Sequence, residues 1–397
     1  MSAVMVAQAQ PVRQVQHVEM PTGTLTLTSE AGPFAADSLL GFAARANVKR
    51  GFLFLSKALG KHWPVRPALM QRVHGVLAAS VPPGLPGPVV FIAMAETAVG
   101  LGQGVFEAWL AANPDREGLF IHTSRYRVGN APLIEFAEAH SHAPRQFLHL
   151  PDDPAMRAML QGARSLVLVD DEASTGNTFL NLVAACRTLS LDVAHVHLCT
   201  ITNFMGAEAT AALSGRFGLP VTMGAALNGS YTFAAGEMAE AAPAQRFDPD
   251  AERGASPCFG RMGLRSALAD PSALAERLAA QVGACERVLV LGTGEFMHPS
   301  FMLGRALEQR GVDVMVQSTT RSPILTWGAV GHALSFPDNY GEGIANFIYN
   351  VAPGQYEHVF ICHETPAGDA LHQLARSLHA RLFHFQSETR IEEIPVC

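Results

Sequence analysis

Two adjacent carboxylates and the short polar loop after them are the residues of this chain best suited to chemistry. Asp170 and Asp171 come directly after four apolar residues, and residues 174–178 are small and polar before an amphipathic stretch begins. Amide groups at the start of a helix have no partner within the helix and lie at its positive end, so such a loop suits a phosphate. Nearby carboxylates suit sugar hydroxyls and can stabilise positive charge that develops on a sugar ring. The segment therefore indicates a sugar phosphate as the ligand.

Several enzyme classes place acids at the end of a strand, but each needs further residues that this chain lacks. A phosphoacceptor receiver domain needs a distal lysine, and no lysine follows Lys61. A P-loop needs a Gly-Lys pair followed by Ser or Thr, whereas Gly60-Lys61 is followed by His62. A dinucleotide site places its glycine loop before the ribose-binding acid, which is the reverse of the order here. A two-metal site needs more acids than Glu172 adds.

The lysines of the chain are unevenly distributed. Lys49, Lys57 and Lys61 are the only three, whereas arginine supplies the remaining 25 of the 28 basic residues. Because lysine is a compact point charge that arginine does not replace equivalently, the cluster, together with Arg50, suggests a cationic patch for a small polyanionic ligand. Compositional drift toward arginine is the alternative explanation.

Composition excludes several other classes. No run of about 18 uncharged apolar residues predicts a membrane-spanning helix, and the first 16 residues do not have the pattern of an export signal. Six scattered cysteines without a C-x-x-C pair favour free thiols in a reducing cytoplasm. A net charge of −7 gives no reason to expect nucleic acid or an anionic membrane as a partner. We therefore expect a cytoplasmic protein that binds small molecules.

Strands that end in polar residues alternate with helices along most of the chain, which is typical of parallel α/β folds. Residues 38–80 are read as helical or mixed segments. In the first half we expect strands at residues 87–96, 118–126, 165–171 and 192–203, with helices at 103–112 and 178–190. The pattern restarts after a Pro- and acid-rich stretch, with strands at 286–296, 313–323 and 358–366 and a helix at 299–311. The predicted organisation is a loosely ordered segment (1–30), an α/β domain (31–235), a linker (236–257) and a second α/β domain (258–397).

The stretch "LVLVDDEASTGNT" (166–178) resembles the PRPP-binding signature of type I phosphoribosyltransferases. It has the apolar run, the two acids and a loop that ends in S-T-G-x-T. It departs from the usual pattern at Glu172 and Ala173, where apolar residues are common. Purine-salvage members often carry an aspartate at the position of Ser174, so the resemblance implies an acceptor closer to the orotate type than to a 6-oxopurine.

Further stretches narrow the resemblance. Residues 45–65, 95–107 and 122–126 are similar to the phosphoribosyltransferase of bacterial tellurium-resistance stress gene clusters. The second half resembles the TRSP domain that accompanies it, named for the motif found here as Thr320-Arg321-Ser322-Pro323. The resemblance implies a type I phosphoribosyltransferase-like parallel sheet flanked by helices, followed by a Rossmann-like α/β domain. Relatives with this fold commonly dimerise, so a homodimer is one assembly it implies.

The resemblance also implies roles for individual residues. Asp170 and Asp171 would hold the ribose hydroxyls of PRPP, directly or through Mg²⁺. The rest of the PRPP-binding segment would be Glu172, Ala173, Ser174, Thr175, Gly176, Asn177 and Thr178. Ala95, Glu96 and Thr97 would form the pyrophosphate loop, and Glu96 could contact a Mg²⁺-bound water. Arg125, or else Arg127, would lie in a mobile loop that closes over pyrophosphate, and further charge would come from Lys49, Arg50, Lys57 and Lys61. The alternatives are an ordinary acid pair that caps the next helix for Asp170 and Asp171, a plain strand-to-helix turn for residues 95–97, and a solvated loop arginine for Arg125.

The second half contains another candidate site. Gly292, Thr293, Gly294 and Glu295 form a turn between a strand and a helix, which could bind an anion. Thr320, Arg321 and Ser322 follow another strand and could approach that turn, because α/β folds bind ligands at the carboxyl ends of strands. A tight turn with a structural arginine is the alternative. The histidine pairs at 140 and 142 and at 195 and 197 lack acids or cysteines at ligand spacing, which favours structural roles.

Together these features predict a Mg²⁺-dependent phosphoribosyltransferase. It would join ribose 5-phosphate to a nitrogenous acceptor and release pyrophosphate, as part of a stress pathway that makes a nucleotide-like metabolite. Two alternatives remain open: a sensor that binds PRPP or a nucleotide without turnover, and an enzyme whose TRSP domain is the catalytic half.

Overall fold

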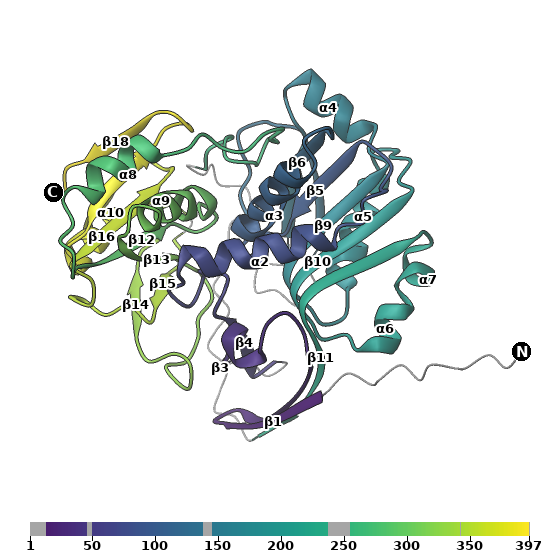
Figure 1. The fold of residues 1–397 in the computed structure, drawn as a ribbon, viewed down its shortest axis with the longest axis horizontal. Coiled ribbons are helices and arrows are strands. Elements are labelled where there is room, and N and C mark those ends of the chain that lie inside the picture. Colours follow the sequence, from purple (N-terminus) through teal and green to yellow (C-terminus); the bar gives the residue numbers. More distant parts are fainter. Residues whose placement is uncertain (1–12, 46–49, 138–144, 237–254, 342, 397) are drawn as a thin grey trace, which may run out of the picture.

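The computed structural model describes residues 13–45, 50–137, 145–236, 255–341 and 343–396, which build two α/β units (Figure 1). One sheet has seven strands in the order β1-β2-β11-β10-β9-β5-β6, and the other has five in the order β13-β12-β16-β17-β18. The predicted α/β class is therefore confirmed. None of the described helices is long and apolar enough to cross a membrane.

The centre of the larger sheet is parallel. It consists of β5 (Val89–Ala93), β6 (Gly118–His122), β9 (Ser165–Ala173), β10 (His195–Asn203) and the first part of β11 (Val221–Ala235). These strands are almost continuously apolar, as expected where both faces of a sheet are covered. One face packs against α2 (Pro67–Ser80) and α3 (Val99–Ala112). The other packs against α4 (Pro154–Gln161), α5 (Asn177–Arg187) and α7 (Leu213–Phe217), and α6 (Ala207–Ala211) precedes α7.

Residues 13–30 are not the loosely ordered segment that the sequence predicted. They form β1 (Arg13–Met20) and β2 (Gly23–Glu30), an antiparallel pair joined to the second part of β11. Leu25 and Leu27 are fully buried while the residues beside them are partly exposed, which is the alternation of a sheet with one covered face. Figure 1 shows β11 bending away from the parallel sheet toward this pair.

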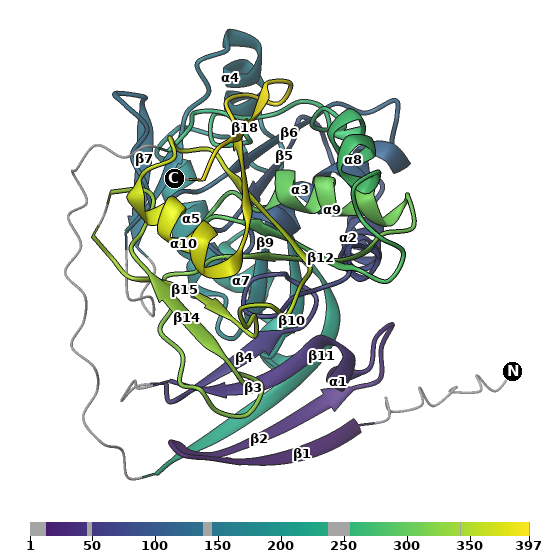
Figure 2. The ribbon, with the colours of Figure 1, turned by 90° about the vertical axis from the view of Figure 1, so that its left-hand side faces the viewer.

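Residues 40–44 and 52–56 form strands where the sequence predicted helical or mixed segments. After α1 (Ala36–Leu39), β3 (Leu40–Ala44) and β4 (Phe52–Ser56) make an antiparallel hairpin. The rings of Phe52 and Phe54 pack edge-on against Tyr231 of β11, with centroids 5.1 and 5.3 Å from its ring. This aromatic contact holds the hairpin beside β11 (Figure 2). A second hairpin, β7 (Leu133–Ala137) and β8 (Arg145–His149), follows β6 in the chain.

The smaller sheet is also parallel apart from its last strand. Its strands are β13 (Asp313–Ser318), β12 (Arg287–Gly292), β16 (His358–His363), β17 (Arg381–Phe385) and the antiparallel β18 (Ile391–Ile394). The helices α8 (Ser272–Ala279) and α9 (His298–Glu308) pack on one face, and α10 (Asp369–Leu378) packs on the other. The pair β14 (Ala333–Phe336) and β15 (Asn346–Tyr349) lies between β13 and β16 in sequence. The second α/β domain predicted from the sequence is present.

An edge strand of each sheet shares backbone hydrogen bonds with a segment of the other unit. Val65, just before α2, exchanges N–H···O bonds of 2.9 and 2.8 Å with Val316 of β13. Leu264 exchanges two bonds of 2.8 Å with Phe120 of β6. Each unit therefore covers an edge strand of the other, which protects that edge from pairing with a second chain.

Candidate active site

The two aspartates of the opening motif lie where β9 extends beyond its neighbour. β5 ends opposite Val169, and β9 continues for four more residues that include both acids. Asp170 and Asp171 are half-buried, and the amide of Asp171 donates to Oδ1 of Asp170 at 2.9 Å. A pair of partly exposed carboxylates is thus available at the carboxyl end of the parallel sheet, where α/β folds bind their ligands.

The loop after the acids turns directly into α5. Gly176 has φ +73°, a left-handed conformation that side chains disfavour, and it stands at the cap position of the helix. Arg216 holds the turn by donating to the carbonyl oxygen of Thr175 at 2.7 Å and to Oδ1 of Asn177 at 2.8 Å. Thr175 and Asn177 are exposed, and Ser174 and Thr178 are half-buried. The start of α5 is therefore pre-shaped and accessible, as a phosphate site requires.

Glu172, which departs from the family pattern, pairs with an arginine of the β3–β4 connection. Nη2 of Arg50 donates to Oε1 of Glu172 at 2.7 Å, and the guanidinium lies 4.8 Å above the ring of Phe52. Burial raises the pKa of Glu172, and Arg50 opposes that rise. In this structure the charge of Arg50 ties the hairpin to β9, and its predicted ligand-binding role stays a prediction.

The predicted cationic patch is not assembled. Lys61 has a fully buried side chain, with Nζ 2.5 Å from Oε1 of Glu96 and donating to the carbonyl oxygen of Gly294 at 2.7 Å. Lys57 donates to the carbonyl oxygen of Asp37 at 3.0 Å and lies 5.6 Å from the Trp63 ring. Lys49 lies outside the described residues. The two described lysines thus make separate contacts within the protein.

The segment 95–97 connects β5 to α3, as expected for a pyrophosphate loop. The amide of Ala95 donates to Oγ1 of Thr123 at 2.8 Å, and the Ala95–Glu96 peptide bond is cis. Thr97 is half-buried, and Glu96 is 9% exposed. Oε2 of Glu96 accepts from Nε of Arg321 at 3.1 Å, in addition to the Lys61 contact. Burial alone would raise the pKa of Glu96, but Lys61 and Arg321 outweigh it and lower the pKa to about 2.

Residues 122–126 are not the mobile loop that the resemblance implied. Ser124 is fully buried and exchanges backbone hydrogen bonds with Phe147 at 2.8 and 2.9 Å. The amide of Arg125 and the hydroxyl of Ser124 both donate to the carboxylate of Glu295, at 2.7 and 2.8 Å. Tyr126 stacks on Tyr340 with centroids 4.5 Å apart. The second unit therefore fixes this segment in place.

The other arginine proposed for that loop is engaged nearby. The guanidinium of Arg127 lies 4.7 Å above the ring of Phe147, and its Nη2 is 3.6 Å from Oε2 of Glu135. It therefore packs on the β7–β8 hairpin.

The turn 292–295, where the glycines suggested an anion site, makes hydrogen bonds within the protein. The amide of Gly294 donates to Oγ1 of Thr319 at 2.9 Å, and its carbonyl oxygen accepts from Lys61 and from the hydroxyl of Ser318. Arg321 points to Glu96 in the other unit. The amide and the carbonyl oxygen of Gly294 are thus bonded within the protein, and the Lys61 bond joins the turn to the first unit. An anion site at this turn stays a prediction.

A buried ionic cluster at the junction was missed by the sequence interpretation. Nη2 of Arg261 lies 3.0 Å from Oε2 of Glu295, and its Nη1 lies 2.5 Å from Oε2 of Glu364. The hydroxyl of Tyr340 donates to Oε1 of Glu364 at 2.9 Å. All four side chains are buried. No local motif marks them, because they come from segments 24 to 103 residues apart.

Replacing Arg261 by methionine is expected to lower the free energy of unfolding by about 3–5 kcal/mol, because two carboxylates would stay buried without their cation. Denaturant-induced unfolding at pH 7 measures this change. The matched control is Arg265→Met, whose ion pair with Glu117 is largely exposed and is expected to contribute less than about 1 kcal/mol. Equal effects of the two substitutions would contradict a structural role for the buried cluster.

The histidine pairs behave as structural residues where they are described. Nε2 of His195 and Nδ1 of His197 lie 2.9 and 2.8 Å from the hydroxyl of Thr222. No group of three metal-ligating side chains is found among the described residues, and His140 and His142 lie outside them.

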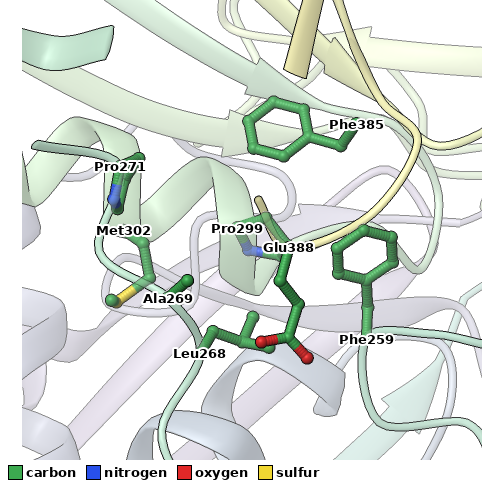
Figure 3. Close-up of a pocket in the computed structure, with 8 residues that line it drawn as sticks. All are labelled: Phe259, Leu268, Ala269, Pro271, Pro299, Met302, Phe385 and Glu388. Carbon is green, nitrogen blue, oxygen red and sulfur yellow. The ribbon is translucent and has the colours of Figure 1, made fainter. Parts of the chain in front are cut away.

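A separate hollow in the second unit is apolar. It is lined by Phe259, Leu268, Ala269, Pro271, Pro299, Met302, Phe385 and Glu388 (Figure 3). These residues come from the α8–α9 side of the smaller sheet, away from the acids of β9 in sequence and in fold. A lining of this kind offers little to a phosphate, so the candidate site remains at the end of β9.

Sequence comparisons agree with this division of the chain. Residues 39–230 match the family described as "Phosphoribosyl transferase", and residues 259–378 match the family described as "TRSP domain C terminus to PRTase_2". A comparison with the curated proteins finds no match.

Among solved structures, adenine phosphoribosyltransferases are similar to part of the chain. The Trypanosoma brucei enzyme in complex with AMP, pyrophosphate and ribose-5-phosphate is 12% identical, covers 48% of this chain and 77% of its own, and gives a TM-score of 0.34. The Giardia lamblia enzyme with 9-deazaadenine is 14% identical, with coverages of 47% and 94% and a TM-score of 0.31. The Leishmania donovani enzyme is 12% identical, with coverages of 47% and 76% and a TM-score of 0.30. The two family matches thus identify a phosphoribosyl transferase domain at residues 39–230, followed by a TRSP domain at residues 259–378.

Proposed function

We propose that this chain is a PRPP-dependent phosphoribosyltransferase that joins ribose 5-phosphate to a nitrogenous acceptor and releases pyrophosphate. The observation that carries the proposal is the continuous path from Asp170 and Asp171 through an accessible loop to the start of α5. Carboxylates for a ribose and a helix start for its phosphate follow one another on one strand-turn-helix unit. The family of residues 39–230 supports the same chemistry.

Each part of the unit has a defined task in this proposal. The carboxylates of Asp170 and Asp171 accept hydrogen bonds from the ribose hydroxyls and stabilise the positive charge that develops on the ring as pyrophosphate leaves. The amides and hydroxyls of residues 174–178 bind the 5′-phosphate, and each charge-assisted bond is worth about 1.5–3 kcal/mol. Residues 95–97 hold the departing pyrophosphate.

The acid pair also fits Mg²⁺. This ion prefers oxygen ligands and is commonly bound by one or two carboxylates together with substrate phosphates, which matches two half-buried aspartates at an open strand end. Bound there, Mg²⁺ would neutralise part of the charge on PRPP. Glu96 is less suited to a metal-bound water, since Lys61 and Arg321 contact its two oxygens. In this proposal Asp170 and Asp171 would hold the metal and the sugar, whereas Glu96 holds residues 95–97 in place through its contacts with Lys61 and Arg321.

The acceptor side of the site lacks the aspartate that purine-salvage phosphoribosyltransferases often carry. Ser174 makes a side-chain hydrogen bond with Tyr231 of β11, and no carboxylate stands at that position. We therefore place the acceptor nearer the orotate type than the 6-oxopurines. The proposal of a nucleotide-like product for a cytoplasmic stress pathway rests on the sequence resemblance alone.

The test is release of pyrophosphate from PRPP by the intact chain with Mg²⁺ and a panel of acceptors. The panel contains orotate and other pyrimidines, adenine, hypoxanthine and guanine. We expect release with at least one member and less with hypoxanthine and guanine. PRPP binding without release over the whole panel would favour the sensor, and preferred use of hypoxanthine would contradict the reading of Ser174.

A further inference from the structure

The TRSP motif extends from the second unit to two loops of the first. Nε of Arg321 donates to Oε2 of Glu96 at 3.1 Å, and the hydroxyl of Ser322 accepts from Nη2 of Arg45 at 2.8 Å. Glu96 lies in the turn after β5, and Arg45 follows β3. Neighbouring residues of one motif thus contact the two segments of the first unit that flank the candidate site.

The backbone around Arg321 is held on both sides. Thr320 exchanges backbone hydrogen bonds of 3.0 and 2.7 Å with Phe347 of β15, and its hydroxyl accepts from the amide of Ser322 at 3.2 Å. The hydroxyl of Tyr349 donates to the carbonyl oxygen of Ser322 at 2.7 Å and accepts from the amide of Ile324 at 2.8 Å. Because both neighbours are fixed, the side chain of Arg321 approaches Glu96 from a rigid support.

The carboxylate of Glu96 is contacted from two directions. Arg321 contacts one carboxylate oxygen, and the buried Nζ of Lys61 contacts the other at 2.5 Å. Lys61 in turn donates to the carbonyl oxygen of Gly294, so this second contact also leads to the TRSP unit. With its pKa lowered to about 2, the carboxylate of Glu96 stays ionised at neutral pH and keeps both contacts.

Glu96 sits in the middle of the segment that would bind pyrophosphate. The amide of Ala95 is bound to the hydroxyl of Thr123, and Thr97 leads into α3. Fixing the Glu96 side chain therefore fixes the backbone between these two points. A displacement of about 1 Å in such a loop can cost on the order of 100-fold in rate.

We propose that Arg321 is a positioning residue for phosphoribosyl transfer, which acts through Glu96 to hold the pyrophosphate loop in place. This inference rests on the proposed function, since it takes residues 95–97 to be that loop. It gives the TRSP unit a role as the support of the first unit's site. The Thr-Arg-Ser-Pro motif then provides the contact through which the TRSP unit supports the site.

The test compares the intact wild-type chain with Arg321→Gln, Arg321→Lys and the control Arg66→Gln. Arg66 also pairs across the two units, with Asp313 at 2.9 Å, but at the surface and without contact to Glu96. We expect Arg321→Gln to raise the KM for PRPP and the Kd for Mg²⁺-pyrophosphate about tenfold or more, with the acceptor KM unchanged. Arg321→Lys should restore part of the loss, and Arg66→Gln should match wild type.

A double-mutant cycle tests whether Arg321 acts through Glu96. In a Glu96→Gln background, the further change Arg321→Gln is expected to have an effect of less than about twofold, because its partner charge is already gone. Fully additive effects would overturn the inference. The inference would also be overturned if Arg321→Gln bound PRPP and pyrophosphate as tightly as Arg66→Gln does. It would be overturned too if the only effect of Arg321→Gln were a smaller fraction of folded protein. Failure of the folded wild type to bind PRPP or pyrophosphate would instead reject the proposed function.

Discussion

The double substitution Asp170→Asn with Asp171→Asn is expected to lower kcat/KM for PRPP at least about 100-fold. Each carboxylate accepts a charge-assisted bond worth about 1.5–3 kcal/mol, and asparagine cannot supply the negative charge. Loss of two such bonds corresponds to about 3–6 kcal/mol in the barrier. The measurement is steady-state release of pyrophosphate with a saturating acceptor.

This loss should occur without unfolding. Both acids are half-buried at the end of β9, and asparagine has nearly the same shape, so the free energy of unfolding should change by less than about 1 kcal/mol. Asp192→Asn, at an exposed position paired with Arg164, is the matched control and should retain full activity. An active double variant would remove these acids from the mechanism.

Lowering the pH from 7.5 to 5.5 is expected to reduce the free energy of unfolding by about 8 kcal/mol. In the described part of the chain, burial is the main cause that lowers the pKa of six buried histidines from 6.5. The pKa is about 3 for His62 and His74 and about 4 for His122, His149, His197 and His363. The unfolded chain binds protons below pH 6.5, whereas the native chain resists them until about pH 4. Stability is therefore lost as the pH falls through this window, by about 1.3 kcal/mol per histidine at pH 5.5.

Denaturant unfolding at several pH values measures the effect. His197→Gln should remove about one sixth of the pH dependence, because glutamine can still bond to Thr222 and takes up no proton. His17→Gln, at an exposed position of β1, should leave the pH dependence of the free energy of unfolding unchanged. A free energy of unfolding that is flat between pH 7.5 and 5.5 would show that these histidines are not shielded as the structure describes. Since native proteins are typically stable by 5–15 kcal/mol, the chain is expected to unfold near the acidic end of this range.

The parts of the fold that the sequence predicted are those with local signals. β5, β9, β10, β12 and β16 are apolar runs with a polar end, and the Asp-Asp pair leads into α5 within a few residues. β1 and β2 were missed because β2 pairs with a strand about 200 residues later, Gly23 opposite Ala235, and because the alternating residues of both strands are too polar to resemble core strands. The hairpin β3–β4 was missed because its burial depends on aromatic rings of β11.

The site residues divide in the same way. The placement of Asp170, Asp171 and the loop follows from one contiguous motif, whereas the roles of charged residues depend on distant partners. Lys61 contacts Gly294, which is 233 residues away, so nothing near it in sequence indicates burial. The Gly-Thr-Gly turn indicated an anion site because its backbone pattern is local. In the structure, the amide of Gly294 instead donates its hydrogen bond to the hydroxyl of Thr319. In hindsight, the unusual Glu172 was the one visible sign that Arg50 has an internal partner.

Calorimetric titration of the folded intact chain with PRPP and Mg²⁺ tests the central claim most directly. We predict saturable binding at one site per chain, abolished in the Asp170→Asn, Asp171→Asn variant and retained in Asp192→Asn. No binding by the folded wild-type chain, or equal binding by the double variant, would contradict the assignment of these acids and their loop to PRPP.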